Sequence, residues 1–219
     1  MNMWDVYWKN YAIKQAIKYS EQREDIKILL KYLPYGGFIL EAGCGIGLCI
    51  INLFSKTHAK IIGVDISAEA LKIAKTILSA KNVEFIRADI NKLPFRDSLF
   101  DLIISLGVIE HLHNPKTAVR EMEQVLKKDG VLFITVPNAY CFPHRILRFL
   151  RRKLKTWQFG IEESFTVFQL KAFLSQSSHL ESGYFYWGRK PLFKIFKKVF
   201  GRIFLKFGSM VYIVARKES

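Results

Sequence analysis

The sequence predicts an α/β fold in which helices cover both faces of a mainly parallel, doubly wound sheet. Two observations predict it. Apolar runs of strand length alternate with helical patterns five times between residues 38 and 137, and a glycine-rich turn follows the first run. Helical crossovers pair successive strands in parallel, with right-handed connections. A chain of 219 residues, 50% of them hydrophobic, is long enough for one domain with a large core.

The N-terminal residues 4–33 space their apolar side chains as a helix does, and Pro34-Tyr35-Gly36-Gly37 ends the pattern. Aromatic residues are dense at the start of this segment, where the sequence places Trp4, Tyr7, Trp8 and Tyr11. Two explanations of these aromatic residues are equally good: the helix packs on the edge of the sheet, or it forms a lid over a bound ligand.

The first strand–helix–strand unit predicts a nucleotide-type site. An apolar run at 38–40 leads into a turn that contains Gly43, Gly45 and Gly47, and a second run at 61–64 ends on Asp65. The glycines let the backbone turn tightly and approach a ligand. An acid at the tip of the second strand can accept hydrogen bonds from two ribose hydroxyls.

The glycine spacing indicates which nucleotide is bound. Dinucleotide sites use G-x-G-x-x-G around a pyrophosphate, whereas this turn reads G-x-G-x-G with Glu41 two residues before the first glycine. A carboxylate there repels phosphate and suits an ammonium group, which disfavours an NAD-dependent reductase. A degenerate dinucleotide site and a glycine turn without a ligand stay open as alternatives.

The later elements follow the same alternation. Ser67 is the expected N-cap of a helix over 68–80, and an alternating strand over 83–89 ends on Asp89. A fourth, nearly all-apolar strand spans 100–105, and Asn114-Pro115 opens a helix that reaches Leu126. Asp129-Gly130 turns the chain into the remaining predicted strands, which are 131–137, 183–186 and 209–215.

Two motifs together resemble a known family. The turn matches (D/E)-x-G-x-G-x-G, the first motif of the class I S-adenosylmethionine (SAM) dependent methyltransferases, and residues 93–112 contain LPF, FDLIIS and VIEHL in that order. This order closely resembles the type 11 methyltransferases, the group that includes the ubiquinone and menaquinone ring C-methyltransferases. The resemblance is strong over 36–140 and looser over 160–219.

The resemblance implies a Rossmann-like sheet of seven strands whose last strand is antiparallel. It implies SAM as the methyl donor, S-adenosylhomocysteine as the product and no metal. Asp89 is expected to accept from the adenine amino group and Ile90 to pack near the ring. Residues 1–35 are expected to form a lid on a methyltransferase domain that spans 36–219. The cofactor-binding set that the resemblance implies is Glu41, Gly43, Gly45, Gly47, Asp65, Ile66, Asp89, Ile90 and Leu106.

The positive charge is concentrated near the C-terminus. Residues 1–140 contain 18 Lys/Arg and 15 Asp/Glu, whereas 141–219 contain 16 Lys/Arg and only 4 Asp/Glu. Two basic amphipathic segments, 141–160 and 189–208, carry much of this excess. An anionic membrane surface suits helices with aromatic and aliphatic residues on one face and cations on the other. RNA fits less well because its bases need accessible aromatics, and an ordinary core helix with a solvated face is an equal alternative.

Candidate catalytic residues follow the fourth strand. His111, beside Glu110, could remove a proton from a hydroxyl or a ring carbon, although both residues could equally shape the loop. The Asn/Asp-Pro-Pro-Tyr type motif of nucleic-acid amino-methylases is absent, because Ser105-Leu106-Gly107-Val108 stands in its place.

Cellular location is predicted from what the sequence lacks. The three cysteines have no CxxC spacing, which argues against a zinc site and fits a reducing compartment. Neither a membrane-spanning apolar run nor a secretory signal is visible. The chain is therefore expected in the cytoplasm, peripheral at the membrane.

The sequence thus predicts a SAM-dependent methyltransferase that O- or C-methylates a small-molecule or lipid-linked acceptor. An RNA methyltransferase that uses the basic C-terminal part is one alternative, and a non-catalytic SAM-binding accessory subunit is another.

Overall fold

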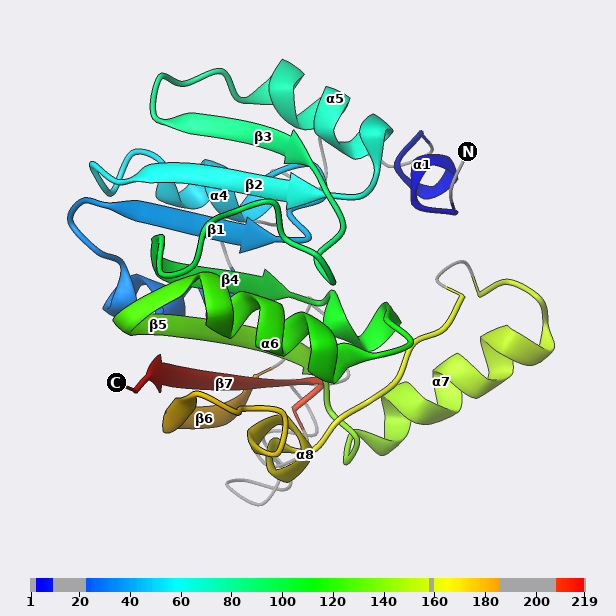
Figure 1. Cartoon of the computed structure of the whole chain (residues 1–219). Coiled ribbons are helices and arrows are strands. Elements are labelled where there is room, and N and C mark those ends of the chain that lie inside the picture. The colour runs from blue at the N-terminus through cyan, green and yellow to red at the C-terminus, as the bar shows by residue number, and fades with distance from the viewer. Residues whose placement is uncertain (1–2, 10–22, 158–159, 186–207, 219) are drawn as a thin grey trace.

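The computed structural model describes residues 3–9, 23–157, 160–185 and 208–218. Its centre is a seven-stranded sheet in the order β3-β2-β1-β4-β5-β7-β6 (Figure 1). Strands β1 to β5 are parallel, and β7 is antiparallel to both of its neighbours. The predicted Rossmann-like, doubly wound sheet with an antiparallel last strand is confirmed. The strands are β1 (Phe38–Ala42), β2 (Lys60–Asp65), β3 (Val83–Arg87), β4 (Phe100–Leu106), β5 (Leu126–Pro137), β6 (Ser177–Phe185) and β7 (Met210–Lys217).

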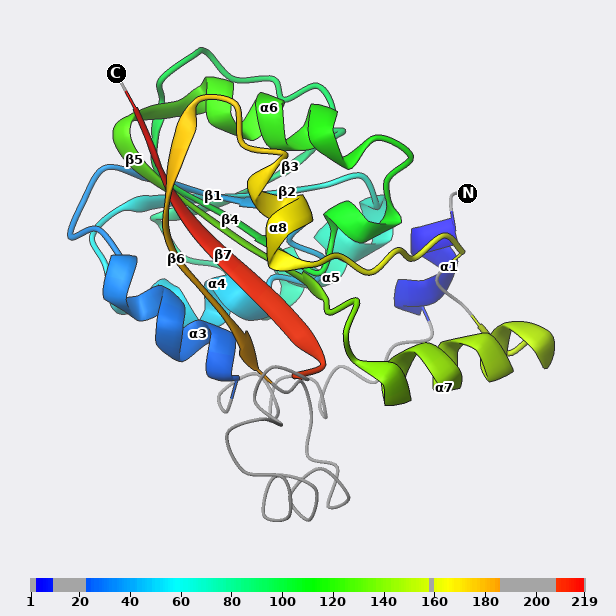
Figure 2. The same ribbon diagram turned by 90° about the horizontal axis from the view of Figure 1, so that it is seen from below.

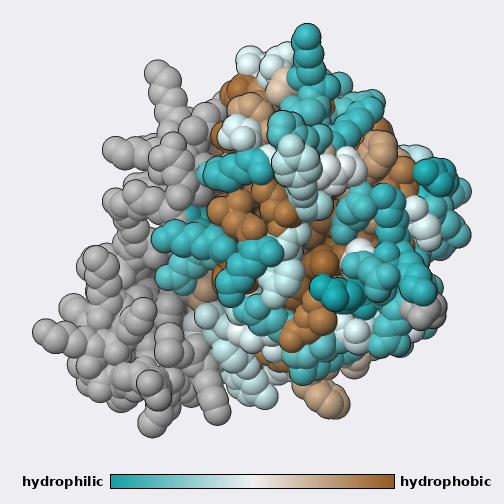
Figure 3. All heavy atoms as spheres, turned by 90° about the vertical axis from the view of Figure 1, so that its left-hand side faces the viewer, coloured by the Kyte–Doolittle hydropathy of each residue, from teal (hydrophilic) through white to brown (hydrophobic). Residues whose placement is uncertain are grey.

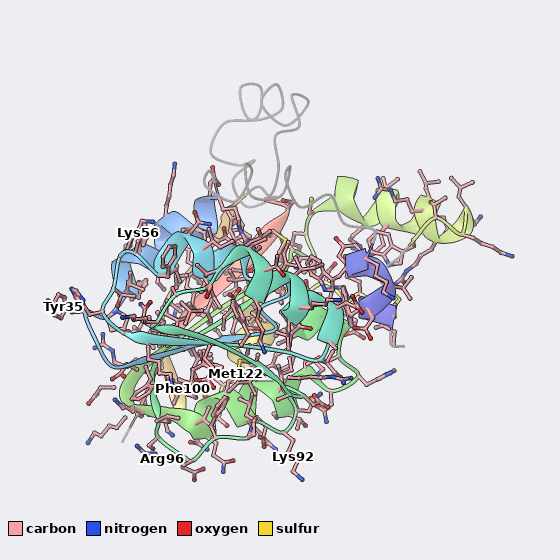
Figure 4. All side chains as sticks on the ribbon, turned by 90° about the horizontal axis from the view of Figure 1, so that it is seen from above. Tyr35, Lys56, Lys92, Arg96, Phe100 and Met122 are labelled. Carbon is pink, nitrogen blue, oxygen red and sulfur yellow. The ribbon has the colours of Figure 1, made fainter. Side chains whose placement is uncertain are left out.

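Helices cover both faces of the sheet (Figure 2). On one face lie α3 (Glu24–Leu29), α4 (Leu48–Leu53) and α5 (Ala68–Ile77), and on the other lie α6 (Pro115–Val125) and α8 (Val167–Lys171). Each face buries its own apolar cluster. Phe100 and Met122, which belong to the cluster under α6, lie in the interior in Figure 4.

The local signals for the helix starts are confirmed. The Ser67 side chain accepts a hydrogen bond from the amide of Ala70 at the start of α5. The Asn114 side chain accepts from the amide of Thr117, and proline occupies the first turn of α6. The helix predicted to reach residue 80 ends at Ile77, because Leu78 is extended, with φ −140° and ψ 106°.

Two strand boundaries were predicted wrongly. β5 begins at 126 rather than 131, and the predicted turn lies inside it, where Asp129 has φ 62° and the pairing with β4 shifts register. β6 begins at 177 rather than 183. It is an edge strand, and its first residues are half-buried serines. The start of the strand therefore leaves no apolar run in the sequence.

The two regions predicted as helical additions are described only in part. The N-terminal pattern gives α1 (Met3–Lys9) and α3, which a short 3₁₀ turn (Leu30–Tyr32) extends, while residues 10–22 lie outside the described residues. The first basic segment forms α7 (Phe142–Lys153). The second lies outside the described residues apart from Gly208.

The two ends of the sheet differ in what lies beside them. The carboxyl ends of the parallel strands point toward α1 and α7 in Figure 1. The opposite end shows a largely hydrophilic described surface with hydrophobic side chains between (Figure 3). No helix within the described ranges is long and apolar enough to cross a bilayer.

Candidate functional site

One cavity of about 490 Å³ lies at the carboxyl ends of β1 to β4, a volume suited to a nucleotide-sized ligand. Both catalytic candidates, Glu110 and His111, line it. Gly47 is the one predicted cofactor residue outside the lining; it precedes α4 with φ 77°, and a side chain there would meet the Phe85 ring at 3.2 Å. The cofactor candidates that line the cavity are Glu41, Gly43, Gly45, Asp65, Ile66, Asp89, Ile90 and Leu106.

The glycine turn is fixed to β2 and covered by α1. The amides of Gly43 and Cys44 donate hydrogen bonds of 2.8 and 2.9 Å to the carbonyl of Val64. Gly45 has φ 52°, and a Cβ there would lie 2.7 Å from the Trp8 ring. Glycine is therefore required both by the backbone conformation and by the close approach of α1.

The side chain of Asp65 is held by backbone amides of the glycine turn and of the start of α5. Its Oδ2 accepts from the Gly45 amide and its Oδ1 accepts from the Ser67 amide, both at 2.8 Å. Burial raises the pKa of this carboxyl group, and the backbone hydrogen bonds act in the opposite direction. Each oxygen can accept a second hydrogen bond, so the carboxylate can bind two neighbouring hydroxyls.

Glu41 is a buried carboxyl group whose Oε2 has no hydrogen-bond partner among the described residues. Burial raises its pKa to about 8, while the charge of Arg23 lowers it. A buried polar atom without a partner is costly. Because Glu41 lines the cavity, a cationic ligand group such as an ammonium would supply the missing partner, and the residues present therefore fit SAM.

The predicted adenine residues lie at the tip of β3. Asp89 is exposed, and its Oδ1 accepts two 2.9 Å hydrogen bonds from the backbone and side-chain nitrogens of Asn91. Ile90 is buried, whereas Ile66 is exposed at the cavity. This placement is compatible with an adenine subsite, which stays a prediction.

Glu110 and His111 lie in a 3₁₀ turn (Ile109–His111) after β4. Burial raises the pKa of Glu110 well above its ordinary value, the nearby carboxylate of Glu162 raises it further, and Oε2 has no hydrogen-bond partner among the described residues. The Nδ1 of His111 lies 2.8 Å from the carbonyl oxygen of Ile161, which only accepts, so Nδ1 carries the hydrogen. In the neutral ring Nε2 is then the proton acceptor, and it lies 4.0 Å from the Glu110 Oε1.

Three cavity or anchoring residues were not identified from the sequence. Asp5 of α1 accepts a 2.6 Å hydrogen bond from the Ser67 hydroxyl, and Arg23 and Glu162 line the cavity. All three come from segments without a recognisable motif, so only their acidic or basic character could have indicated them. Among the described residues no cluster of His, Cys, Asp and Glu could hold a metal ion.

Comparison with known proteins identifies the class to which this fold and cavity belong. A family model described as a methyltransferase domain matches residues 40–134. An uncharacterized protein of Methanocaldococcus jannaschii is 31% identical over 163 residues, which cover 72% of each chain. The chain belongs to the class I SAM-dependent methyltransferases, and its central domain is of type 11.

A second relative and a solved structure extend the comparison. A second uncharacterized protein of Methanocaldococcus jannaschii is 37% identical over 132 residues, 59% of this chain, and this match spans about half of the relative (48%). Among solved structures, a chain of the complex between the Haloferax volcanii Trm112 methyltransferase activator and the putative methyltransferase has a TM-score of 0.77. That match covers 99% of this chain and 98% of the other at 14% identity, and it shows the fold.

Proposed function

We propose that this chain transfers the methyl group of SAM to an oxygen or carbon atom of a small-molecule or lipid-linked acceptor. One observation carries the proposal. A single cavity contains Glu41, whose Oε2 has no hydrogen-bond partner among the described residues, and the anchored Asp65 at one side, and the Glu110–His111 pair at the other. The donor and acceptor sites are therefore contiguous.

The donor side has a group for each part of SAM. Glu41 would pair with the ammonium group, Asp65 would accept from the ribose hydroxyls, and Asp89 with Ile90 would hold the adenine. When bound, SAM supplies a methyl group that its positive sulfur activates for displacement.

The residues of the chain then align the acceptor and exclude water. Trp4 and Tyr7 line the cavity, and the Trp4 ring meets the His111 ring edge to face, with 4.9 Å between the centroids. We infer that α1 acts as the lid over both ligands. A lid that carries aromatic side chains gives the acceptor an apolar surface to bind.

His111 is the group that removes a proton when the acceptor is a hydroxyl or a carbon acid. Its Nε2 receives the proton because Nδ1 is already committed to the Ile161 carbonyl. Burial raises the pKa of Glu110, which favours its protonated form over the carboxylate, so His111 is the base in this proposal. The apolar and aromatic lining of the cavity favours a lipid-like acceptor. Such an acceptor resides in a membrane, so we expect the enzyme to act at its cytoplasmic surface.

The test follows the methyl group. The purified protein is incubated with methyl-labelled SAM and a cell extract, and the products are separated into organic-solvent, RNA and protein fractions. Label in the organic fraction supports the proposal. Label in RNA supports the RNA methyltransferase, and the absence of label in every fraction, although SAM binds, supports a non-catalytic SAM-binding subunit.

A further inference from the structure

Helix α7 exposes an apolar stripe. Its apolar side chains at positions i, i+3, i+4 and i+8 share one face of the helix, and they are between 46% and 71% exposed. Side chains of this size are normally buried, so a contiguous row of them indicates a surface that another molecule covers. The stripe consists of Ile146, Phe149, Leu150 and Leu154.

Exposed cations flank this stripe. Residues 142–155 contain no acidic residue. The positive charge along the helix therefore has no acid of its own to neutralise it, and it is complementary to an anionic surface. The exposed cations are Arg145, Arg151, Arg152, Lys153 and Lys155.

The remaining contacts of α7 attach it to the wall of the cavity. Arg148 lies 3.1 Å from Glu162 Oε1 and donates to the Glu162 carbonyl at 3.2 Å, and Arg152 donates to the same carbonyl at 3.4 Å. Glu162 lines the cavity, and the amide of Glu163 donates to the carbonyl of Glu110. Only one short loop therefore separates α7 from the acceptor side.

The same end of the molecule carries further exposed apolar residues. Met3 and Val6 of α1 are 42% and 47% exposed, and Ile161 is 41% exposed. A Cβ at Gly160 would lie 3.0 Å from the Met3 sulfur, which shows that the 160–165 loop adjoins α1. Both α1 and α7 lie at the carboxyl ends of the parallel strands in Figures 1 and 2.

We propose that α7 docks the protein on an anionic phospholipid bilayer, with its apolar stripe among the acyl chains and its cations at the headgroups. Docking through α7 brings the cavity, whose lining includes the Arg148 partner Glu162, close to the bilayer that holds a lipid-linked acceptor. The entry of the acceptor rests on the proposed function, whereas docking itself can be measured without methyl transfer.

The side chains of α7 favour a bilayer over RNA. The stripe has three aliphatic members and one aromatic, Phe149, and Lys153 lies over the Phe149 ring, 5.2 Å from its centroid. Bases of RNA stack on open aromatic faces, which aliphatic side chains do not provide. Acyl chains accept aliphatic and aromatic side chains alike.

Flotation of the full chain with vesicles tests docking. The vesicles contain phosphatidylcholine alone or phosphatidylcholine with phosphatidylglycerol. One pair of variants removes apolar groups, with F149S/L154S on α7 and F168S/L180S as the control at exposed sites elsewhere. A second pair removes two cations, with R145Q/R151Q on α7 and K72Q/K75Q on the exposed face of α5 as the control.

The wild type and both controls are expected to float with anionic vesicles only. R145Q/R151Q is expected to partition about thirtyfold more weakly, and F149S/L154S at least about tenfold more weakly, with unchanged SAM affinity. Failure of the wild type to float overturns the proposal, and so does equal flotation of the α7 variants and their controls. A third outcome assigns the basic surface to nucleic acid instead. In that outcome the wild type does not bind vesicles, and both the wild type and F149S/L154S bind single-stranded RNA.

Discussion

The amide of Gly45 donates a 2.8 Å hydrogen bond to the Oδ2 of Asp65, across 20 positions of sequence. The glycine turn and the acid at the tip of β2 are therefore one structural unit. Movement of either changes the other, so a substitution at Asp65 is expected to affect the conformation of the turn as well as the ribose contacts.

Asp65→Ala is expected to weaken SAM binding by about a hundredfold, because two hydrogen bonds to a charged group are lost. Isothermal titration with SAM measures the change. Asp97→Ala is the matched control, since Asp97 is an exposed acid outside the cavity lining that accepts one hydrogen bond from Gln124. Equal SAM affinity in the Asp65 variant and the wild type would refute the ribose role.

Glu41→Gln is expected to stabilise the ligand-free protein at alkaline pH while weakening SAM binding. The folded-state pKa of about 8 lies above the ordinary value of 4.5. Between these values the folded chain keeps a proton that the unfolded chain has released, so the free energy of unfolding falls as pH rises. Glutamine removes this dependence, and the variant should be more stable by a few kcal/mol near pH 8.

Thermal unfolding near pH 5 and near pH 8 measures that effect, with Glu84→Gln as an exposed control. Titration with SAM in parallel measures the lost ammonium partner. A pH slope that is the same in Glu41→Gln and the wild type would contradict the buried, protonated state of Glu41. Unchanged SAM affinity would separately contradict its pairing with the ammonium group.

The features that the sequence predicted correctly are local ones. Ser67 and Asn114 identify helix starts because a cap bonds to an amide three residues away. The glycine turn directly follows β1, and Asp65 is the last residue of β2, so both are close in sequence to the strands that position them. Buried parallel strands are recognisable because both of their faces are apolar.

The features that the sequence did not predict depend on distant or weakly patterned contacts. The hydrogen bond between Asp5 and Ser67 spans 62 positions, and the pair formed by Arg148 and Glu162 joins two segments that carry no motif. Strand β6 is an edge strand with half-buried polar residues, so its apolar pattern is short. Motif spacing and hydrophobic periodicity do not report contacts between distant segments or edge strands without an apolar pattern.

Asp5→Ala is expected to speed the dissociation of SAM about tenfold, if α1 is the lid that we propose. Asp5 Oδ1 accepts from the Ser67 hydroxyl at 2.6 Å and from the Glu69 amide at 3.3 Å, and these bonds fix α1 to the start of α5. Stopped-flow fluorescence measures the rate, because Trp4 and Trp8 line the cavity. Lys72→Ala on the exposed face of α5 is the control, and identical rates in both variants would refute the lid.

His111→Gln is expected to lower kcat by about 10²–10⁴ while leaving SAM affinity unchanged, because the imidazole acts on the acceptor and not on the donor. His113→Gln is the matched control, since His113 is exposed two residues away and does not line the cavity. The activity of the wild type should fall on acidification, because a protonated imidazole cannot accept a second proton. That decline in activity should disappear in His111→Gln. If the decline persists in this variant, or if His111→Gln and His113→Gln have equal kcat, the proton is removed by another group or not at all.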